Sequence, residues 1–337
     1  MIKTAIIGLG KMGMSHCALL GAHPEVDLVA ICDPDGLLQS AFKKLTGFQV
    51  YDDYKKMIET EKPEAIFVAT PTRFHSEMVL YALERGIHVF CEKPFSLTSE
   101  EGEKMVAVAK AKGCVNQAGY HNRFIGTFNE MKRLFAAGVI GTPFHFMGEA
   151  YGPVVLKPKG GTWRADKKSG GGCLMDYASH VLNLINYITG SHLTEARGTF
   201  MPRIFSKEVD DAIYATLKVE NGLQGQLSVC WSDDTHRKMT TSLKIEGDKG
   251  KLEADATTLK IYLKEDNEKE ALKKGWNTRY ITELTPQVYF NLRGEEYSAQ
   301  IDHFVRCIQN GTMNHRNTFE EALQTDYIVD KLIEDAK

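Results

Sequence analysis

Three polar side chains have the types and positions that acid–base chemistry requires. Asp176 and His180 lie four residues apart on a predicted helix, shortly after the glycine run 170–172. At that spacing two side chains share one helix face, and because the rest of this helix is apolar, both need a polar partner. Lys93 follows a predicted buried strand, a position from which its ammonium group could act on a substrate hydroxyl. The pattern indicates that His180 is a general base. The alternative for Asp176 and His180 is a buried pair that satisfies its own hydrogen bonds, and the alternative for Lys93 is a surface lysine without a catalytic role.

A glycine-rich turn near the start of the chain follows the apolar strand predicted over 3–7 and opens a helix. The turn consists of Gly8, Leu9, Gly10, Lys11, Met12 and Gly13. The first glycine permits a tight turn, the second lets the backbone approach a pyrophosphate, and the third lets the helix pack closely on the strand. The helix N-terminus attracts the phosphates. We therefore expect this turn to bind a dinucleotide; the alternative is a glycine-rich turn without a ligand.

Asp33 ends the second predicted strand, 26–32. A carboxylate at that place can accept hydrogen bonds from the ribose hydroxyls of the adenosine, and it repels a 2′-phosphate. The residues that follow, 34–36, contain no Arg or Lys that could bind such a phosphate. The sequence therefore predicts NAD rather than NADP. The alternative role of Asp33 is to cap the following turn.

A further turn follows the strand predicted over 65–69. Ligands of open parallel sheets lie beyond the carboxyl ends of the strands, so the residues of this turn are expected to border the cofactor. They are Thr70, Pro71 and Thr72. His75 opens the next helix and is a further expected cofactor contact; its alternative is a cap or surface residue.

The strand predicted over 87–91 is followed by Glu92, Lys93 and Pro94. A charged pair after a buried strand is expected to face the same crevice as the other turns. Pro94 biases Lys93 toward an extended backbone. Glu92 and Lys93 are therefore both expected beside the cofactor.

The elements that must position these residues form two groups. Over the first 120 residues short apolar strands alternate with helices, which predicts a doubly wound parallel sheet, that is, an α/β Rossmann domain over 1–122. The strands are expected at 3–7, 26–32, 49–51, 65–69, 87–91 and 115–118, and the clearest helices at 76–84 and 99–112. Ser99 is the expected N-cap of the second helix.

From residue 123 the pattern changes to hairpins separated by Gly and Asn/Asp turns. It predicts an α+β domain over 123–337 with a mostly antiparallel open sheet, whose last helices are able to pack back on the first domain. Strands are expected at 142–150, 195–203, 211–219, 224–231, 240–246, 250–254 and 258–263; helices at 126–137, 172–187, 296–310 and 318–335. The charged segment 264–274 is expected in solvent. One face of this sheet needs cover from a partner subunit, so a homo-oligomer (dimer or tetramer) is expected.

Composition narrows the class of protein. A chain of 337 residues with 43% hydrophobic and 25% charged residues is typical of a soluble protein of two domains. The net charge of −3 gives no reason to expect a nucleic acid or a membrane surface as partner, and we find neither a signal peptide nor an apolar run that could span a membrane. The seven cysteines are scattered without a C-x-x-C pair. We therefore expect neither disulfides nor a zinc site, no metal ligands, and a cytoplasmic location.

Together the motifs resemble the glucose–fructose oxidoreductase / inositol dehydrogenase / rhizopine catabolism (Gfo/Idh/MocA) family. The likeness covers nearly the whole chain and rests on the glycine turn, the Glu-Lys-Pro turn, the segment 119–124 and the glycine run with its Asp and His. It implies that Lys93, Asp176 and His180 form the catalytic set. Many members have Asp where this chain has Asn183, which leaves the role of that position open.

The resemblance implies reversible hydride transfer between a secondary hydroxyl of a sugar, sugar derivative or cyclitol and the nicotinamide of NAD. His180 would take the hydroxyl proton, Lys93 would stabilise the developing charge, and Asp176 would hold the substrate or the His–Lys geometry. Whether Lys93 or His180 handles the proton stays open. The remaining expected cofactor contacts are Asn122 and Arg164. The remaining expected substrate contacts are Tyr120, His121, Arg123, Tyr151 and Trp163.

Three alternatives stay open. The loop lysines Lys157, Lys159 and Lys167 could serve a phosphorylated or nucleotide-linked sugar. The resembled family also contains glycosidases that use bound NAD for a transient oxidation, and relatives that bind the dinucleotide as non-catalytic regulators. The presence of all three expected catalytic residues argues against a regulator.

Overall fold

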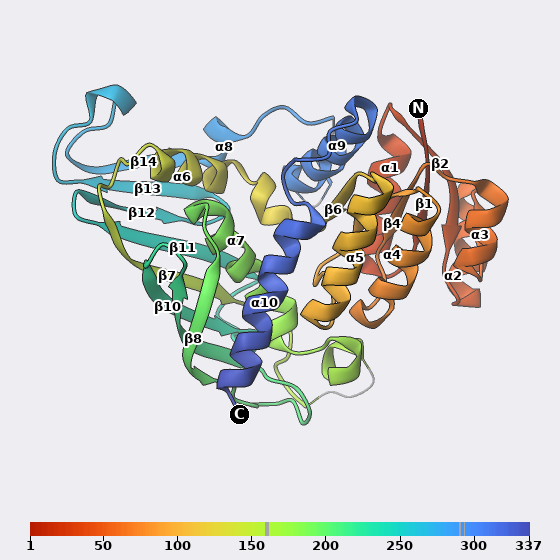
Figure 1. The fold of residues 1–337 in the computed structure, drawn as a ribbon, viewed down its shortest axis with the longest axis horizontal. Coiled ribbons are helices and arrows are strands. Elements are labelled where there is room, and N and C mark those ends of the chain that lie inside the picture. Colours follow the sequence, from red (N-terminus) through yellow and green to blue (C-terminus); the bar gives the residue numbers. More distant parts are fainter. Residues whose placement is uncertain (159–161, 290, 293) are drawn as a thin grey trace. The chain divides into compact units, whose positions relative to one another are not determined.

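The computed structural model describes residues 1–158, 162–289, 291–292 and 294–337; Lys159 lies outside them. The chain forms two compact units (Figure 1). Unit 1 comprises Met1–His121 and Val288–Leu323, and unit 2 comprises Asn122–Gln287 and Gln324–Lys337. The expected division at 122/123 lies one residue from the first crossing, but a single boundary does not describe the chain, because 288–323 belongs to unit 1.

Unit 1 is built on a six-stranded sheet in the order β3-β2-β1-β4-β5-β6. All neighbouring strands are parallel. The strands are β1 (Ile2–Ile7), β2 (Val26–Cys32), β3 (Gln49–Tyr51), β4 (Ala65–Val68), β5 (His88–Cys91) and β6 (Asn116–Ala118). Every residue of β4 is buried, as expected for a parallel strand covered on both faces. The expected doubly wound sheet is confirmed, with the strand order of dinucleotide-binding domains.

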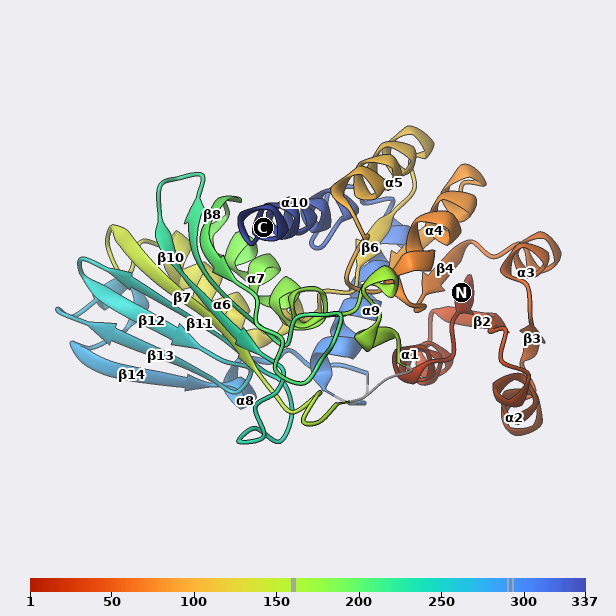
Figure 2. The same ribbon diagram turned by 90° about the horizontal axis from the view of Figure 1, so that it is seen from below.

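Helices cover both faces of this sheet: in Figure 2, α1 and α9 lie on one side and α4 and α5 on the other. The helices of unit 1 are α1 (Lys11–Ala22), α2 (Gly36–Thr46), α3 (Tyr54–Glu61), α4 (His75–Glu84), α5 (Ser99–Lys112) and α9 (Glu295–Asn310). Ile301 and Phe304 of α9 join the core that contains Ile6 and Phe67. This burial explains why a segment so late in the chain belongs to unit 1.

The start of α5 differs from the sequence-based expectation. Thr98, not Ser99, is the N-cap, because its side chain accepts a hydrogen bond from the Glu101 amide. Ser99 is the first helical residue. Asp35 and Asp53 cap α2 and α3 in the same way, two helices that we had not predicted.

Unit 2 contains an eight-stranded sheet in the order β14-β13-β12-β11-β7-β10-β9-β8. All neighbours are antiparallel except β7 and β10, which are parallel. The strands are β7 (Pro143–Tyr151), β8 (Leu193–Phe200), β9 (Ala212–Val219), β10 (Gln224–Cys230), β11 (Thr240–Gly247), β12 (Gly250–Ala254), β13 (Thr258–Leu263) and β14 (Gly275–Tyr280). The mostly antiparallel sheet is as expected, but β14 was not predicted and β8 ends three residues earlier than 195–203 implies. The segment 264–274 is mostly exposed, and Leu272 alone among its residues is buried.

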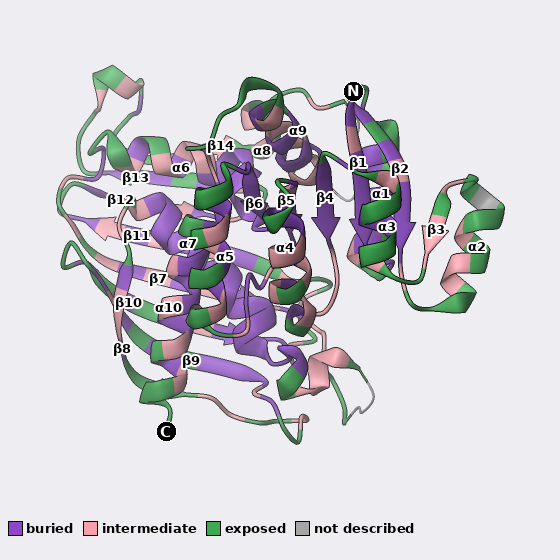
Figure 3. Cartoon of the chain, turned by 45° about the vertical axis from the view of Figure 1, so that its right-hand side comes forward, coloured by how far each residue is buried: buried purple, intermediate pink, exposed green. Residues whose placement is uncertain are grey.

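Helices pack on one face of this sheet and leave the other more exposed. They are α6 (Gly126–Ala136), α7 (Ser179–Thr189) and, from Gln324 onward, α10 (Phe319–Asp335); the short α8 (Ile281–Leu284) follows β14. Gly148 of β7 makes room for α7, since a Cβ there would lie 2.6 Å from Val181 Cγ1. Figure 3 shows the buried residues concentrated in the strands and in α7. None of the helices in the described ranges is long and apolar enough to cross a membrane.

Candidate active site

The glycine turn has the backbone that a phosphate-binding turn needs. Gly8 has φ +100°, and a Cβ there would lie 2.6 Å from the Ala69 carbonyl oxygen. A Cβ on Gly13 would lie 1.9 Å from the Gly8 carbonyl oxygen, so α1 packs directly on the turn. Around a Cβ on Gly10, by contrast, no heavy atom of the described residues lies within 4 Å. The second glycine thus faces open space, where a pyrophosphate can approach.

The N-terminus of α1 suits an anion. Its N-cap is Gly10, which has no side chain to satisfy the first amides, and the first turn of this described helix carries no acidic residue. Lys11 is exposed and Met12 half-buried. Unsatisfied amides at the positive end of a helix attract phosphate, so the residues present fit the dinucleotide expected from the sequence.

Asp33 caps the turn after β2 and also contacts the glycine turn, while its expected contact with the ribose stays a prediction. Its Oδ1 accepts a hydrogen bond from the Asp35 amide (2.9 Å), which caps the turn after β2. Its Oδ2 accepts one from the Leu9 amide (2.6 Å), inside the glycine turn. A carboxylate has about four acceptor positions, so Asp33 can hold the glycine turn and still accept ribose hydroxyls.

His75 lies between two turns at the end of the sheet. It is fully buried, with Nε2 2.9 Å from the Thr70 carbonyl oxygen and Nδ1 3.0 Å from that of Pro94. Burial lowers the pKa of its imidazole, an effect that outweighs the hydrogen bonds to these carbonyls. Because both ring nitrogens contact the backbone, His75 is neither a cap nor a surface residue. Its contacts position the turns around Thr70 and Pro94, and the direct cofactor contact expected from the sequence stays a prediction.

Glu92 supports the backbone of Lys93 from inside unit 1. Its Oε1 lies 2.6 Å from Nε2 of His16 on α1, and its Oε2 accepts a hydrogen bond from the Lys93 amide. Burial tends to raise the pKa of this carboxyl, but the His16 contact and nearby positive charge hold it below the usual value. A Cβ on Gly119 would lie 2.8 Å from Glu92 Oε2, so a glycine is needed there. His16, a buried polar residue of the mostly apolar helix α1, was not predicted from the sequence.

The end of β6 is held by a late segment of the chain. Nδ2 of Asn317, a residue with φ +71°, donates hydrogen bonds to the carbonyl oxygens of Ala118 (2.7 Å) and Tyr120 (3.1 Å). Tyr120 is buried, and the ring of His121 stacks on that of Tyr297 with centroids 4.8 Å apart. Asn317 therefore fixes the backbone of Ala118 and of Tyr120, the second of which is an expected substrate contact.

In unit 2, Asp176 and His180 lie on one continuous helical segment, as expected. Its first turn is a π-helix, η5 (Leu174–Ala178), which continues into α7. Both side chains are buried, 4% and 2% exposed. Such widened turns occur frequently at functional sites, and this one contains Asp176 itself.

Arg164 is the ion-pair partner of Asp176. Its Nε lies 2.9 Å from Asp176 Oδ2, and its guanidinium lies over the ring of Trp163. Both residues belong to η3 (Trp163–Ala165). A Cβ on Gly171 would lie 2.3 Å from the Arg164 carbonyl oxygen, so the glycine run lets η3 approach the helix that carries Asp176.

Two adjacent carboxylates stabilise this part of unit 2 by accepting hydrogen bonds. Neither was predicted from the sequence. Asp210 Oδ2 accepts a hydrogen bond from the Leu174 amide (2.6 Å) at the start of η5, and burial raises its pKa. Asp211 is fully buried and accepts hydrogen bonds from Trp231 Nε1 (2.6 Å) and from the amides of 204–206. The sequence feature that could have indicated them is a pair of acidic residues directly before the apolar strand β9.

Arg123 and Asn183 form a pair inside unit 2. Arg123 Nε donates to Asn183 Oδ1 (2.7 Å), and Asn183 Nδ2 donates to Thr325 Oγ1 (3.0 Å). The Arg123 guanidinium also lies 5.0 Å from the centre of the Tyr187 ring. Asn183 thus joins α7 to α10, which gives a role to the position left open. These contacts fix the side chain of Arg123, and the expected substrate contact of this residue stays a prediction.

Tyr151 lies on the wrong face of the sheet for the expected substrate contact. In β7, Gly148 and Ala150 face α7, whereas Tyr151 points the other way, with its OH 2.7 Å from Ser228 Oγ. Its ring stacks on His236. Because successive strand residues alternate between faces, Tyr151 cannot line the same side of unit 2 as His180.

For the other expected residues the structure gives the degree of burial. Thr72 and Asn122 are buried, whereas Thr70, Pro71 and Trp163 are half-buried. Lys157 and Lys167 are exposed. The candidate residues therefore form two groups, one in each unit: the glycine turn, Asp33 and the Glu92–Lys93 turn in unit 1, and Arg164, Asp176 and His180 in unit 2.

Comparison with known proteins identifies the family. The model of the oxidoreductase family with an NAD-binding Rossmann fold (GFO_IDH_MocA) matches residues 2–120, and that of the GFO/IDH/MocA C-terminal domain matches residues 128–253. The chain belongs to the Gfo/Idh/MocA oxidoreductase family. The family, the fold and the NAD cofactor expected from the sequence are thereby confirmed.

Among similar proteins is the D-glucoside 3-dehydrogenase of Escherichia coli strain K12, 28% identical over 80% of this chain and 81% of that protein. The scyllo-inositol 2-dehydrogenase (NAD(+)) of Bacillus subtilis strain 168 is 24% identical over 92% of this chain and 87% of that protein. A solved levoglucosan dehydrogenase in complex with NADH has the same fold, with a TM-score of 0.87 at 22% identity, covering 99% of this chain and 96% of that one.

Proposed function

We propose that this protein is an NAD-dependent dehydrogenase that oxidises a secondary hydroxyl of a sugar, sugar derivative or cyclitol, and that Lys93, Asp176 and His180 carry the reaction. The observation behind this proposal is the buried Asp176, paired with Arg164 on a widened helical turn one turn before the buried His180. A second support is that similar family members are named as glucoside and inositol dehydrogenases. Buried polar groups clustered in an NAD-binding oxidoreductase are expected to do chemistry.

Unit 1 supplies most of the residues that would hold the cofactor. The amides of the glycine turn and the N-terminus of α1 would bind the pyrophosphate, and Asp33 would accept hydrogen bonds from the adenosine ribose. The turns at Thr70–Thr72 and Glu92–Lys93 are further proposed contacts from unit 1, and Asn122 and Arg164 are the proposed contacts from unit 2. When bound, the nicotinamide supplies the hydride acceptor.

The protein residues then have to orient the substrate and manage one proton. In our proposal His180 accepts the hydroxyl proton on a ring nitrogen, while the ammonium group of Lys93 donates a hydrogen bond to the same oxygen and stabilises its negative charge. Asp176, held by Arg164, fixes the substrate or the histidine. Tyr120, His121, Arg123 and Trp163 are the proposed sugar contacts, whereas Tyr151 is omitted because it points to the other face of the sheet.

A substrate panel tests the reaction class. Purified protein with NAD is mixed with sugars, inositols and nucleotide sugars, and NADH absorbance is followed. Turnover with at least one of these polyols supports the proposal, whereas NADH formation only with substrates that lack a carbinol carbon contradicts it. Hydrolysis of a glycoside without net NADH formation would instead indicate the transient-oxidation reaction.

Substitution of the two proton-handling residues tests the assignment. We expect Lys93→Ala and His180→Ala each to lower kcat by about 10²-fold or more when NAD is saturating. Lys110→Ala, at an exposed lysine of α5, is the matched control and should leave kcat unchanged. Near-normal turnover of both variants with NAD bound would refute the assigned roles.

We also propose that the enzyme is a cytoplasmic homo-oligomer that associates through the more exposed face of the unit 2 sheet. Near the edge of that sheet the rings of Tyr262 and Trp276 lie 5.4 Å apart, and both are exposed. Exposed aromatic residues on a sheet edge favour a protein contact. The seven cysteines are all buried thiols outside disulfides, which supports a reducing compartment.

A further inference from the structure

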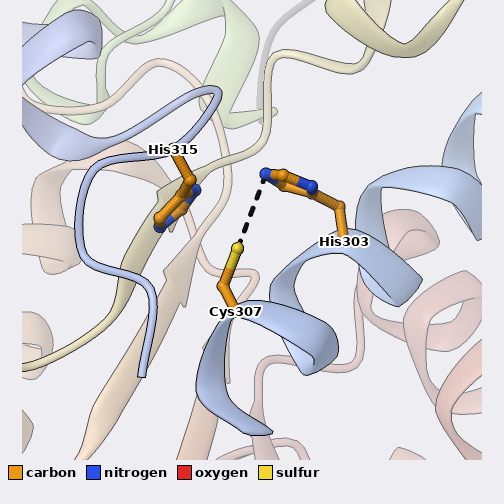
Figure 4. A group of neighbouring side chains, drawn as sticks. All are labelled: His303, Cys307 and His315. Carbon is orange, nitrogen blue, oxygen red and sulfur yellow. Dashed lines mark hydrogen bonds between the residues drawn. The ribbon is translucent and has the colours of Figure 1, made fainter. Parts of the chain in front are cut away.

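We propose that His303, Cys307 and His315 form a zinc-binding site in unit 1, outside the catalytic residues. His303 and Cys307 lie four residues apart on α9, and His315 follows in the segment after that helix (Figure 4). One potential ligand atom from each residue lies within 4.8 Å of the other two. No zinc site was expected from the sequence, because the cysteines form no C-x-x-C pair. No local pattern shows that His315 lies close to His303 and Cys307 of α9.

The pair on α9 already has the spacing that a zinc ion requires. Nε2 of His303 lies 3.7 Å from Sγ of Cys307. With Zn–N and Zn–S bonds of about 2.0 and 2.3 Å at tetrahedral angles, the two ligand atoms of such a pair are about 3.5 Å apart. Ile301 and Phe304 anchor the same helix in the core of unit 1, so this half of the site is preorganised. Only His315 needs to move closer, and the residues just before it, 311–314, are exposed.

His315 is oriented as metal-bound histidines usually are. Its Nδ1 lies 3.0 Å from the carbonyl oxygen of Arg316, an acceptor that favours the tautomer protonated at Nδ1. This leaves a lone pair on Nε2, which is buried and makes no hydrogen bond among the described residues. A backbone carbonyl that binds one ring nitrogen while the other binds the metal is the common second-shell arrangement. A buried polar atom without a partner also calls for an explanation, and a bound ion provides one.

The donor set selects the class of metal. One thiolate and two imidazoles favour a borderline-soft ion such as Zn²⁺ over Mg²⁺ or Ca²⁺, which prefer oxygen ligands. Both histidines would bind as neutral imidazoles, the form that burial favours by lowering their pKa values. Binding converts the Cys307 thiol to a thiolate, so one proton leaves as the Zn–S bond forms. Water would complete the tetrahedron, and no oxidant or reductant is needed.

The site would strengthen a connection within unit 1. His315 lies two residues before Asn317, whose side chain holds the carbonyls of Ala118 and Tyr120 at the end of β6. An ion bound to α9 and to His315 would therefore fix the segment that supports this strand end. We infer a structural role, which is independent of the proposed dehydrogenase activity. The three ligands also lie outside the two stretches that the family models match, 2–120 and 128–253.

Cobalt provides a direct test, since thiolate-bound Co²⁺ has a charge-transfer absorbance that imidazole or carboxylate binding alone does not give. The full-length protein is freed of metal with a chelator and titrated with Co²⁺, then with Zn²⁺. We expect one equivalent to bind with the thiolate band, and Zn²⁺ to displace it. Cys307→Ser should abolish the band, and His315→Ala should weaken binding by about 10²-fold or more. His192→Ala, at an exposed histidine of unit 2, is the matched control and should bind as the wild type does.

Thermal unfolding supplies the second measurement. Zn²⁺ should raise the Tm of the wild-type protein in a concentration-dependent way, because it binds the folded chain, and it should not raise that of His315→Ala. His315→Gln replaces His315→Ala if the alanine variant does not fold. The proposal is overturned if the wild-type protein binds no equivalent of Co²⁺ with a thiolate band, or if the band and the affinity survive in both ligand variants.

Discussion

The backbone of Lys93 is anchored by a buried contact between two polar side chains. The Lys93 amide donates to Glu92 Oε2, and Glu92 Oε1 lies 2.6 Å from His16 Nε2. His16 belongs to α1, the helix that starts at the glycine turn. One pair of side chains therefore connects the proposed phosphate-binding helix with the turn that carries the proposed catalytic lysine. His75 performs a similar task between the turns at Thr70 and Pro94.

The glycine turn yields a matched pair of substitutions. Gly10→Ala should leave the Tm nearly unchanged, since a Cβ there meets no described atom, but should weaken NAD binding about tenfold or more by blocking the pyrophosphate. Gly13→Ala should lower the free energy of unfolding by about 2 kcal/mol, because its Cβ would collide with the Gly8 carbonyl. Calorimetric titration with NAD and thermal unfolding distinguish the two effects. Equal behaviour of both variants would contradict the geometry of this turn.

His75 makes the stability of the protein depend on pH. Its pKa is lowered in the folded protein by burial, whereas the unfolded chain has the ordinary value of about 6.5. Below that pH the unfolded chain takes up a proton that the folded protein does not, so stability falls as the pH decreases from 7 toward 5. This histidine contributes at most about 1.4 kcal/mol per pH unit. Urea unfolding at pH 5, 6 and 7 should show a smaller slope for His75→Gln; an unchanged slope would contradict a neutral buried histidine.

At the scale of elements, the helical segment with Asp176 and His180 depends on a cap from a distant strand. Asp210 precedes β9, and its carboxylate accepts the Leu174 amide at the first residue of η5. The glycine run allows η3, which precedes this helix in the chain, to approach it closely, so that Arg164 pairs with Asp176. The position of Asp176 is thus determined by three elements, only one of which is its own helix.

This cap is open to direct measurement. Asp210→Ala should lower the free energy of unfolding by about 1–2 kcal/mol and should also lower kcat, because the turn that carries Asp176 loses its hydrogen bond. Asp210→Asn retains an acceptor oxygen and should keep most of both quantities. Urea unfolding and steady-state kinetics provide the comparison. If the alanine variant matched the wild type in both, the cap would have no role in holding Asp176.

The sequence allowed the sheets and part of the site to be predicted, for identifiable reasons. Strands of unit 1 are short apolar runs between helices, and Asp176 and His180 are conspicuous in an apolar helix. β14 was missed because it lies at a sheet edge, where exposed and half-buried residues alternate without an apolar face. The contacts of Asp210 with Leu174 and of His16 with Glu92 join residues 36 and 76 positions apart, and no local pattern encodes such pairs.

At the scale of the whole molecule, the proposed association through the unit 2 sheet should determine the oligomeric state. Trp276→Glu places a charge beside Tyr262 on the exposed aromatic patch, and we expect it to shift the protein toward monomer. Leu37→Glu, at an exposed residue of α2 in unit 1, is the control for one added negative charge. Sedimentation at micromolar concentrations measures both. A wild-type protein that is monomeric under these conditions would refute the association.

The crossing of the chain between the two units has a consequence for synthesis on the ribosome. The chain passes from unit 1 to unit 2 after His121, returns at Val288 and leaves again after Leu323. The six strands of unit 1 are therefore translated long before α9, whose Ile301 and Phe304 complete their core. The nascent NAD-binding sheet must wait, with one apolar face incompletely covered, while almost 170 further residues are made. The unit whose strands come first in this chain can thus complete its core only after most of unit 2 has been made.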